Sequence, residues 1–455
     1  MLASINPANQ IILDEVQISS AIEIAIKVKA AHAAKKNWKQ YGIKYRIEIL
    51  RKLFDGLKKR ENELAITTTR EMGKIISESR SDIITDFEYF QDFLDNGPGY
   101  VQDEITCQYG KTTHRIVYEP KGVVGCIVPW NFPFTNFVWA VIPNLLVGNV
   151  VIFKHSEECP LVGKIIDDIM AAIPELSNGV FSQVYGAGDV GNQLAQQPID
   201  MIWFTGSSHV GKELFQIAGA KMIKSVLEMG GSNPAIVFDD VDIDNIVPKI
   251  VHGRFTNCGQ VCDATKRLIV HKNIYDNLIE KLIDEVAKLK VGDPEDEFVQ
   301  IGPLAAMRQL VLLESQVEKS IRLGAKAILG GKRPQALRGA YYEPTLLVNV
   351  QCDMPVWREE VFGPVLPIVH FESEEEAIFL ANDTVYGLGA SVFSTDEERA
   401  KRVASELVVG FVDVNEGNHW RPCNPFGGRK FSGMGSEHGR LGFQELCHFK
   451  VIAEG

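Results

Sequence analysis

The sequence predicts an α/β protein with a doubly wound parallel sheet, a second α/β domain and a small β flap. Short apolar strands alternate with helical segments from Val123 to about Leu289, a pattern typical of parallel strands covered by helices on both faces. The alternation resumes after Glu228, which indicates a second α/β unit. Two β-rich segments, 105–119 and 445–452, stand apart from this pattern, and we expect them to pair.

The first hundred residues are predicted to form a helical layer. Apolar side chains at helical spacing indicate helices over about 18–38, 45–57, 61–69 and 77–94. Asn96-Gly97-Pro98-Gly99 is expected to break this layer. The segment 105–119 then has β character, with Gly110-Lys111 at a hairpin tip.

One stretch of the alternating region could be taken for a membrane-spanning helix. Residues 131–153 carry no charge and are long enough to suggest one. Pro133, Pro143 and Gly148 interrupt them, so we expect a buried helix followed by a buried strand, and no membrane association. The predicted strands cover 123–128, 150–153, 180–185, 201–204, 235–238 and 268–270, and the predicted helices 135–146, 161–173, 210–218, 246–255 and 274–289.

Charge and cysteine usage exclude several classes of function. The 455 residues carry a formal net charge of −12, and no basic run is present, so a nucleic-acid partner is not expected. The eight cysteines show neither a Cys-x-x-Cys pair nor a spaced Cys/His set, which argues against a metal site and a disulfide framework. No signal peptide is visible at the start, and we expect a cytoplasmic protein with reduced thiols.

The stretch from Leu227 to Cys262 carries candidate chemistry. It opens with Glu228 before Met229-Gly230-Gly231 and closes with Gly259-Gln260-Val261-Cys262. A thiolate that attacks a carbonyl, and a carboxylate that moves a proton or activates water, are the parts of covalent catalysis at a carbonyl. A free thiol has a pKa of about 8.5 and is mostly protonated at neutral pH, so Cys262 needs a neighbouring base or a positive field.

Two glycine turns follow predicted strands and are candidates for phosphate binding. Residues 186–191 read G-x-G-x-x-G, but the acidic residue expected about 20 positions later is missing. The second turn runs through Gly206 and Ser207 to Gly211. Either helix N-terminus could hold a phosphate, and each turn taken singly is explained equally well as a tight connection.

Together these segments resemble the aldehyde dehydrogenase superfamily over nearly the whole chain. The interval between Glu228 and Cys262 is the family's, and Met229 is one departure from its Leu-Glu-Leu-Gly-Gly motif. The other matching motifs are Pro129-Trp130-Asn131-Phe132-Pro133, Phe204-Thr205-Gly206-Ser207 with Gly211, Gly259-Gln260-Val261-Cys262, Glu359-Glu360-Val361-Phe362-Gly363-Pro364 and Pro425-Phe426-Gly427-Gly428.

The resemblance implies a covalent mechanism and a fixed role for three residues. Cys262 is similar to the nucleophile that attacks the aldehyde and gives a thiohemiacetal. The side-chain amide of Asn131 and the backbone N–H of Cys262 would form the oxyanion hole. Oxidation gives a thioester, which water activated by Glu228 would hydrolyse. No metal is implied.

The same resemblance implies a nicotinamide cofactor. Its phosphates would lie at the second glycine turn and Trp130, and not at residues 186–191. Glu157 would hold the adenosine ribose, and since a carboxylate repels a 2′-phosphate, we expect NAD to be preferred over NADP. His155 departs from the family's Lys-Pro-x-Glu at this place. The residues expected at the cofactor are Trp130, Lys154, Glu157, Gly206, Ser207, Gly211, Glu360 and Phe362.

Within the family the chain looks most like the compact bacterial succinate-semialdehyde dehydrogenases, because of its short N-terminus and Glu71-Met72-Gly73-Lys74. A dicarboxylate product implies a cation in the substrate tunnel, for which Arg421 and Arg254 are candidates; a solvated loop charge is the competing explanation of Arg421. The arginine that some of these enzymes carry six positions before the nucleophile is Thr256 here. Another aliphatic or aromatic aldehyde is the alternative substrate.

Other classes of protein compete with this interpretation. A coenzyme A-dependent acylating dehydrogenase would avoid a water-activating base such as Glu228. A non-redox cysteine hydrolase would need a histidine partner, and none of the ten histidines lies in a recognisable motif with a cysteine. A non-catalytic binding protein on the same fold would have lost Cys262 or Glu228.

The resemblance also sets the expected domains and assembly. The NAD-binding domain would comprise 1–104 and 120–227, the catalytic domain 228–424, and the flap 105–119 and 425–455. The flap is similar to the family's oligomerisation domain. Its exposed strand edges would be a liability in a monomer, so we expect a homodimer or homotetramer that acts on a small aldehyde.

Overall fold

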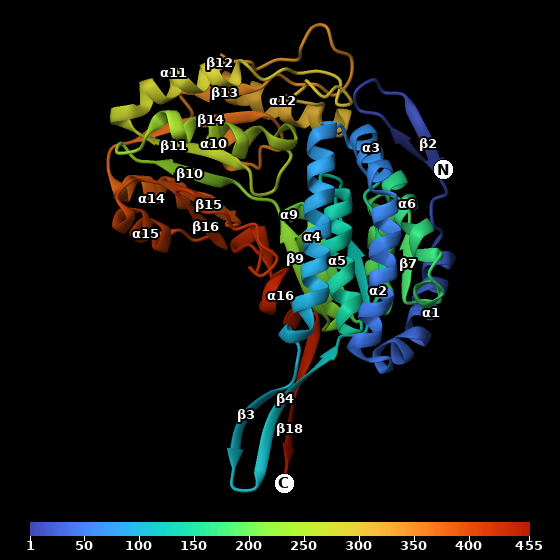
Figure 1. Ribbon diagram of the computed structural model, residues 1–455. Coiled ribbons are helices and arrows are strands. Elements are labelled where there is room, and N and C mark those ends of the chain that lie inside the picture. The colour runs from blue at the N-terminus through green and yellow to red at the C-terminus, as the bar shows by residue number, and fades with distance from the viewer.

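The computed structural model describes residues 1–455 and has two α/β domains with a long β flap projecting from one end (Figure 1). One domain carries a layer of long N-terminal helices, and the other holds most of the C-terminal half of the chain. The predicted fold class is therefore confirmed. The domain boundaries drawn from the sequence stay a prediction.

The first sheet has the order β17-β9-β8-β5-β6-β7, with β17 antiparallel and the others parallel. Its apolar strands are buried, as expected for a sheet with helices on both faces. The strands are β5 (Val123–Ile127), β6 (Val150–Lys154), β7 (Phe181–Val184), β8 (Met201–Gly206), β9 (Lys224–Met229) and β17 (Gly433–Met434). The helices are α1 (Ala21–Gln40), α2 (Gly42–Lys59), α3 (Glu61–Met72), α4 (Ile76–Tyr100), α5 (Pro133–Val147), α6 (Pro160–Ala171), α7 (Pro174–Ser177), α8 (Gly188–Gln196), α9 (Ser208–Lys221) and α16 (Gly439–Glu445).

The second sheet has the order β12-β13-β14-β11-β10-β15-β16, and only β12 at its edge is antiparallel. Its strands are β10 (Asn233–Val237), β11 (Thr265–His271), β12 (Lys326–Leu329), β13 (Thr345–Val348), β14 (Val365–Phe371), β15 (Gly389–Phe393) and β16 (Phe411–Val414). Its helices are α10 (Ile243–Phe255), α11 (Tyr275–Val286), α12 (Met307–Arg322), α13 (Pro355–Arg358), α14 (Glu374–Asn382) and α15 (Glu397–Glu406), with short 3-10 turns η1 (Thr256–Gly259), η2 (Lys272–Ile274) and η3 (Lys430–Ser432).

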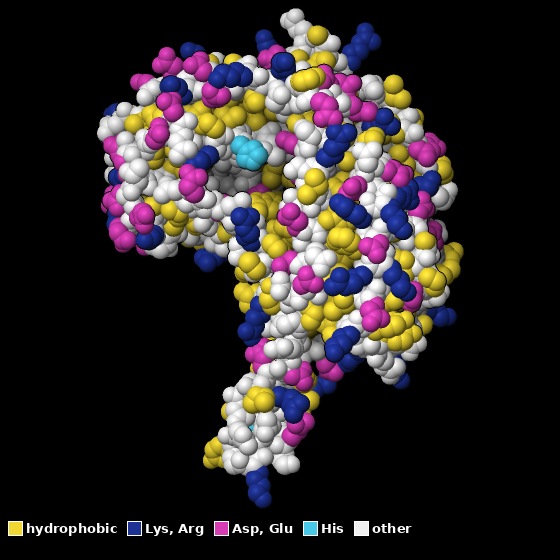
Figure 2. Space-filling model, viewed as in Figure 1, with side chains coloured by type: hydrophobic (Ala, Val, Ile, Leu, Met, Phe, Trp, Pro, Cys, Tyr) yellow, Lys and Arg dark blue, Asp and Glu magenta, His cyan; other side chains and the backbone are white.

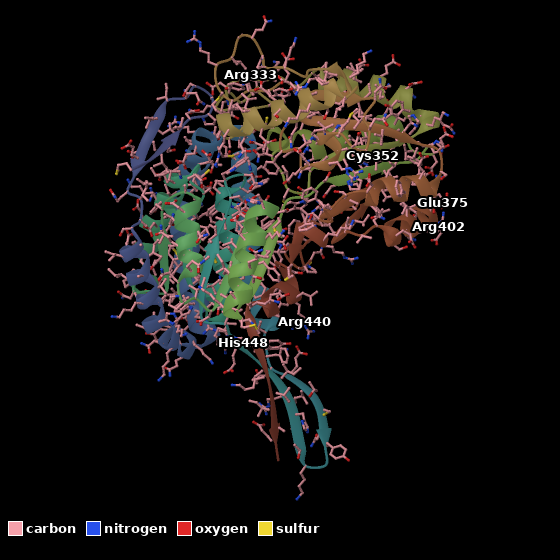
Figure 3. The ribbon with its side chains drawn as sticks, turned by 180° about the vertical axis from the view of Figure 1, so that it is seen from behind. Arg333, Cys352, Glu375, Arg402, Arg440 and His448 are labelled. Atoms are coloured by element: carbon pink, nitrogen blue, oxygen red, sulfur yellow. The ribbon has the colours of Figure 1, made fainter.

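The flap consists of β3 (Glu104–Tyr109), β4 (Thr112–Pro120) and β18 (Cys447–Glu454). As predicted, β18 pairs with β4, from Cys447 opposite Pro120 to Glu454 opposite Thr113. Figure 3 shows Arg440 and His448 at the root of the flap, where an ion pair joins Arg440 to Glu104. Apolar side chains remain exposed along the flap, among them Tyr109, Phe449 and Val451.

Two expectations about the first hundred residues are wrong. The first hundred residues were expected to be helical throughout. The chain instead begins with a β hairpin, formed by β1 (Leu2–Ile5) and β2 (Ile12–Val16). Helix α4 does not end before Asn96 but continues through Gly97 and Pro98 to Tyr100. Gly97 packs so closely on Phe443 and Leu146 that a Cβ would lie 2.6 Å from the Phe443 ring, and this packing outweighs the local breaking signal.

The membrane question raised by residues 131–153 also has a structural answer. They form α5 and β6, and every residue of both elements is buried. No helix of the protein is long and apolar enough to cross a membrane.

The two sheets meet at a short connection. Strand β9 of the first sheet leads into β10 of the second through Gly230, Gly231 and Ser232. Figure 2 shows the surface hollowed between the two domains. Glu228 and Cys262, the catalytic residues predicted from the sequence, lie on β9 and on the loop before β11, next to this junction.

Candidate active site

Cys262 is presented by a loop between α10 and β11 whose backbone is unusual. Asn257, Cys258 and Gly259 are successive residues in the left-handed region, with φ of 51°, 55° and 73°. Non-glycine residues in this region cost free energy and persist only where the surroundings hold them. Here the backbone N–H of Asn257 donates to Glu78 over 3.0 Å, and its side-chain amide donates to the Asn131 carbonyl over 2.9 Å.

Asn131 lies directly against this loop. It precedes α5, is buried, and its side-chain Nδ2 donates to the carbonyl of Gln260 over 3.1 Å. Gln260 in turn accepts the backbone N–H of Ala305 on its side chain. The structure therefore brings Asn131 to the loop that carries Cys262, with the amide N–H on the side of that loop.

The thiol of Cys262 is in a mixed electrostatic environment. Burial and the neighbouring Asp263 raise its pKa well above the ordinary value, and Glu360 and Glu228 act in the same direction. Lys266 opposes them. The Lys266 ammonium is buried and donates to the Cys262 carbonyl over 2.6 Å, so it supplies positive charge next to the Cys262 loop.

Glu228 sits in β9 with its carboxyl group buried and without any hydrogen-bond partner on either oxygen. Burial and Glu437 raise its pKa well above the ordinary value, and burial raises the pKa of Glu437 to about 8. Gly427 faces this carboxyl group closely, and a Cβ there would lie 3.2 Å from Oε1. Gly231, three residues after Glu228, packs against the Cys262 backbone, and a Cβ there would lie 2.8 Å from the Cys262 carbonyl oxygen.

The second glycine turn lies where β8 ends and α9 begins. Ser207 caps α9, and its hydroxyl accepts the N–H of Val210 over 3.4 Å. Gly211 packs against Met229 at the end of β9, where a Cβ would collide with the sulfur. This turn therefore presents a helix N-terminus at the carboxyl edge of the parallel sheet, close to Glu228.

The first glycine turn lies elsewhere, beyond the edge strand β7. Gly186 packs against the side chains of Val190 and Ile18, and the N-terminal segment bonds to it through Ser19 and Tyr185.

Two aromatic rings and a carboxylate lie near the Cys262 loop, where Lys266 Nζ is 5.2 Å from the centroid of the Phe362 ring. Trp130 and Phe362 make an edge-to-face contact with ring centroids 5.6 Å apart. Glu360 accepts hydrogen bonds from Lys266 over 2.6 Å and from the backbone N–H of Gly231 over 3.1 Å. Lys266 thus joins the Cys262 loop to Glu360.

Lys154 and Glu157, at the end of β6, form an ion pair with 3.4 Å between Nζ and Oε2. A third residue from the second domain joins them: Arg308 contacts Glu157 over 3.1 Å and Glu158 over 2.8 Å. Burial raises the pKa of Glu157, but Lys154 and Arg308 outweigh it and the pKa is lowered.

The model of the aldehyde dehydrogenase family matches residues 1–452. The chain belongs to the aldehyde dehydrogenase family. Its activity class is accordingly the NAD(P)-dependent oxidation of an aldehyde.

Individual relatives of this dehydrogenase act on different aldehydes. It is 34% identical to a succinate-semialdehyde dehydrogenase [NADP(+)] of Deinococcus radiodurans, over 99% of this chain and 94% of that protein. It is 36% identical to a betaine aldehyde dehydrogenase of Bacillus subtilis, over 98% of this chain and 93% of that protein. The structure of a lactaldehyde dehydrogenase from Escherichia coli has a TM-score of 0.96 and 32% identity, covering 99% of this chain and 95% of that one.

The two arginines considered as substrate anchors differ in their surroundings. Arg254 is fully buried and donates to the carbonyls of Val361 and Gly363, so it holds the loop around Glu360 in place. Arg421 is exposed and donates only to the neighbouring Trp420 carbonyl over 2.9 Å. Nε and Nη1 of Arg254 also lack hydrogen-bond partners but are buried, whereas the remaining donors of Arg421 are exposed.

An aromatic cluster lies beside Asp263, the residue after Cys262. The indole Nε1 of Trp420 donates to Asp263 over 2.9 Å, and the Trp420 ring lies 5.2 Å from that of Trp139. Phe426, Tyr89 and His438 pack on Trp139 at 6.0, 5.3 and 4.1 Å between ring centroids. We call these residues the aromatic cluster.

Several residues of the site have no counterpart among the sequence predictions. Lys266 could have been noticed as a charge at the start of the apolar strand β11, and Asp263 as the neighbour of Cys262. No sequence signal distinguishes the residues that are distant in the chain and reach the site only when the protein is folded. These are Glu78, Arg308, His419 and Glu437.

Proposed function

We propose that this aldehyde dehydrogenase is non-acylating and that Cys262, Asn131 and Glu228 carry the reaction. Two observations support this most. The Asn131 amide bonds to the Cys262 loop, and Glu228, with an unpartnered carboxyl group, lies three residues before Gly231, which packs against the Cys262 carbonyl. A coenzyme A-dependent enzyme has no use for the carboxyl group. Formation of NADH from aldehyde and NAD without coenzyme A tests the proposal, and a strict need for coenzyme A would refute it.

In the first half of the reaction the Cys262 thiol loses its proton to solvent, and the thiolate sulfur attacks the aldehyde carbon. The carbonyl oxygen then carries negative charge, and the Asn131 amide and the backbone N–H of Cys262 donate to it. For this, Asn131 has to exchange its bond to the Gln260 carbonyl for one to the substrate. A bound nicotinamide would supply the hydride acceptor for the thiohemiacetal carbon, and loss of that hydride would leave a thioester on Cys262.

In the second half water attacks the thioester, and Glu228 removes a proton from that water. Burial together with Glu437 raises the pKa of Glu228, and a carboxylate takes up a proton more readily as its pKa rises. Because no protein group bonds to its oxygens, the carboxyl group is free to bind water. The same donors to oxygen serve both halves of the reaction.

The residues around the glycine turn fit a dinucleotide in their chemistry. The N-terminus of α9, with Gly206 and Ser207, suits a pyrophosphate, and Glu360 suits ribose hydroxyls. Trp130 and Phe362 offer flat apolar surfaces for the nicotinamide. Gly211 acts through packing, since it lets α9 approach Met229.

Glu157 supports a preference for NAD. Its carboxylate can accept the adenosine ribose hydroxyls and disfavours a 2′-phosphate, as the sequence predicts. Arg308 and Lys154 partly offset its charge, so NADP would still bind, more weakly. Direct titration with both nucleotides tests this, and equal affinities would refute it.

Succinate semialdehyde is the substrate proposed from the sequence. Relatives with that name are among the most similar, and Arg421 is a cation with free donors close to the aromatic cluster. Turnover of succinate semialdehyde should then exceed that of the neutral butanal, and Arg421→Gln should remove the difference.

A cationic aldehyde is the second candidate, and the aromatic cluster favours it. Ammonium groups bind over aromatic faces, with about 0.5–2 kcal/mol per contact. The Asp263 carboxylate lies at the edge of the cluster, where it accepts the indole N–H of Trp420. A trimethylammonio aldehyde compared with its neutral carbon isostere, 3,3-dimethylbutanal, decides this: a clearly lower KM for the cation supports this candidate, and equal KM values exclude it.

The flap supports the proposal of an oligomer. Its exposed apolar side chains include Ile105 and Phe449. They would be covered if the flap of one subunit packed against the flap or a domain of another subunit. The mass in solution, by light scattering, tests it, and a monomer at micromolar concentration would refute it.

A further inference from the structure

A histidine lies between two carboxylates next to the nucleophile. His419 Nε2 is 2.9 Å from Oδ2 of Asp263, and its Nδ1 is 2.7 Å from Oδ2 of Asp413. The imidazole stacks on Phe411 with 3.6 Å between ring centroids, and it is largely buried. Three elements are joined in this way: the loop after Cys262, strand β16 and the segment 415–422.

The geometry fixes the protonation of this histidine. Ionised carboxylates only accept hydrogen bonds, so both ring nitrogens of His419 must donate, and only the imidazolium has two N–H groups. Burial alone would lower the pKa of His419, but its hydrogen bonds to Asp263 and Asp413 raise it to about 9. His419 therefore carries a positive charge at neutral pH.

This charge matters because Asp263 also faces the thiol. Its Oδ1 is 3.9 Å from the Cys262 sulfur, and an unbalanced carboxylate at this distance opposes formation of a thiolate. The other charged groups that act on Cys262 are Lys266, Glu360 and Glu228, and of these only Lys266 is positive.

We propose that His419 is a positioning residue for the nucleophile, which neutralises Asp263 beside the thiol and holds the segment 415–422 against the Cys262 loop. Trp420 of the same segment adds the second hydrogen bond to Asp263. The inference rests on the proposed role of Cys262. None of the motifs shared with the family contains His419 or Asp263.

The test measures thiol reactivity without cofactor or aldehyde. Iodoacetamide labelling of the Cys262 peptide is followed by mass spectrometry between pH 6 and 10, in the wild type, His419→Gln, Asp263→Asn and the double variant. His419→Gln should raise the midpoint by about one pH unit and slow labelling at pH 7.5 about tenfold. The double variant should recover most of this loss, because the carboxylate that needed balancing is gone.

Trp420→Phe is the matched control, since it removes the other hydrogen bond to Asp263 and leaves the charges unchanged. It should keep the wild-type midpoint, and far-UV circular dichroism should be the same for all variants. An unchanged midpoint in His419→Gln, or a double variant as slow as His419→Gln, would overturn the proposal. Failure of the proposed function has a different signature: the wild type would form no NADH from any aldehyde while its thiol titrates as described.

Discussion

Replacing Glu228 by glutamine should separate the two halves of the reaction. Glutamine has nearly the same shape, and Glu228 has no hydrogen bond in the protein to lose, so the variant should fold normally. Attack by Cys262 and oxidation do not need the carboxylate. Hydrolysis of the thioester does, because water must lose a proton as it attacks.

The loss of hydrolysis rate in Glu228→Gln can be estimated from the role of a single buried carboxyl group. Glu228 is buried, and Glu437, which raises its pKa further, has its own pKa raised to about 8 by burial. A positioned general base contributes about 10²- to 10⁴-fold. Each factor of ten corresponds to about 1.4 kcal/mol, so the barrier to hydrolysis should rise by about 3–5 kcal/mol.

The assay is rapid mixing of enzyme, NAD and aldehyde with detection of NADH. The Glu228→Gln variant should give a burst close to one NADH per active site, followed by a steady rate 10²- to 10⁴-fold below that of the wild type. A burst that is lost together with the steady rate would place Glu228 in the first half of the reaction. A steady rate near that of the wild type would refute its role as the base.

The remaining predictions concern single groups. Asn131→Ala should lower kcat/KM about 10²- to 10³-fold with thiol labelling unchanged, because an oxyanion donor is lost; a loss under threefold would contradict this. Glu437 has a pKa raised from 4.5 to about 8 in the fold, so its stabilising contribution is present at low pH and is lost as pH rises toward 8. Urea unfolding at pH 5.5 and 8 should therefore show a smaller loss of stability in Glu437→Gln than in the wild type, and equal losses would contradict it. Glu157→Gln should strengthen NADP binding relative to NAD in fluorescence titrations, and an unchanged ratio would show that the carboxylate does not select the cofactor.

The sequence predicted the parts of this enzyme that local patterns and short motifs encode. Buried parallel strands are continuous apolar runs, which is why β5, β6 and β8 were located within a few residues. The pairing of β18 with β4 was also predicted, since both segments are β-rich and stand outside the alternation.

What the sequence could not predict depends on contacts between distant segments. The continuation of α4 through Gly97 depends on Phe443, a residue near the other end of the chain. The same holds in the site, where His419 reaches Asp263 and Arg308 reaches Glu157 only after the second domain has folded. Charge balance around a thiol is a property of three-dimensional neighbours, and no spacing in the chain reports it.

The most direct test of the central claim is to identify the atom that carries the substrate. Enzyme mixed with NAD and aldehyde is quenched in acid within milliseconds, and its peptides are analysed by mass spectrometry. The account predicts an acyl group on Cys262, more abundant in Glu228→Gln, and no NADH from Cys262→Ala. An acyl group on another residue, or NADH formation by Cys262→Ala near the wild-type rate, would contradict it.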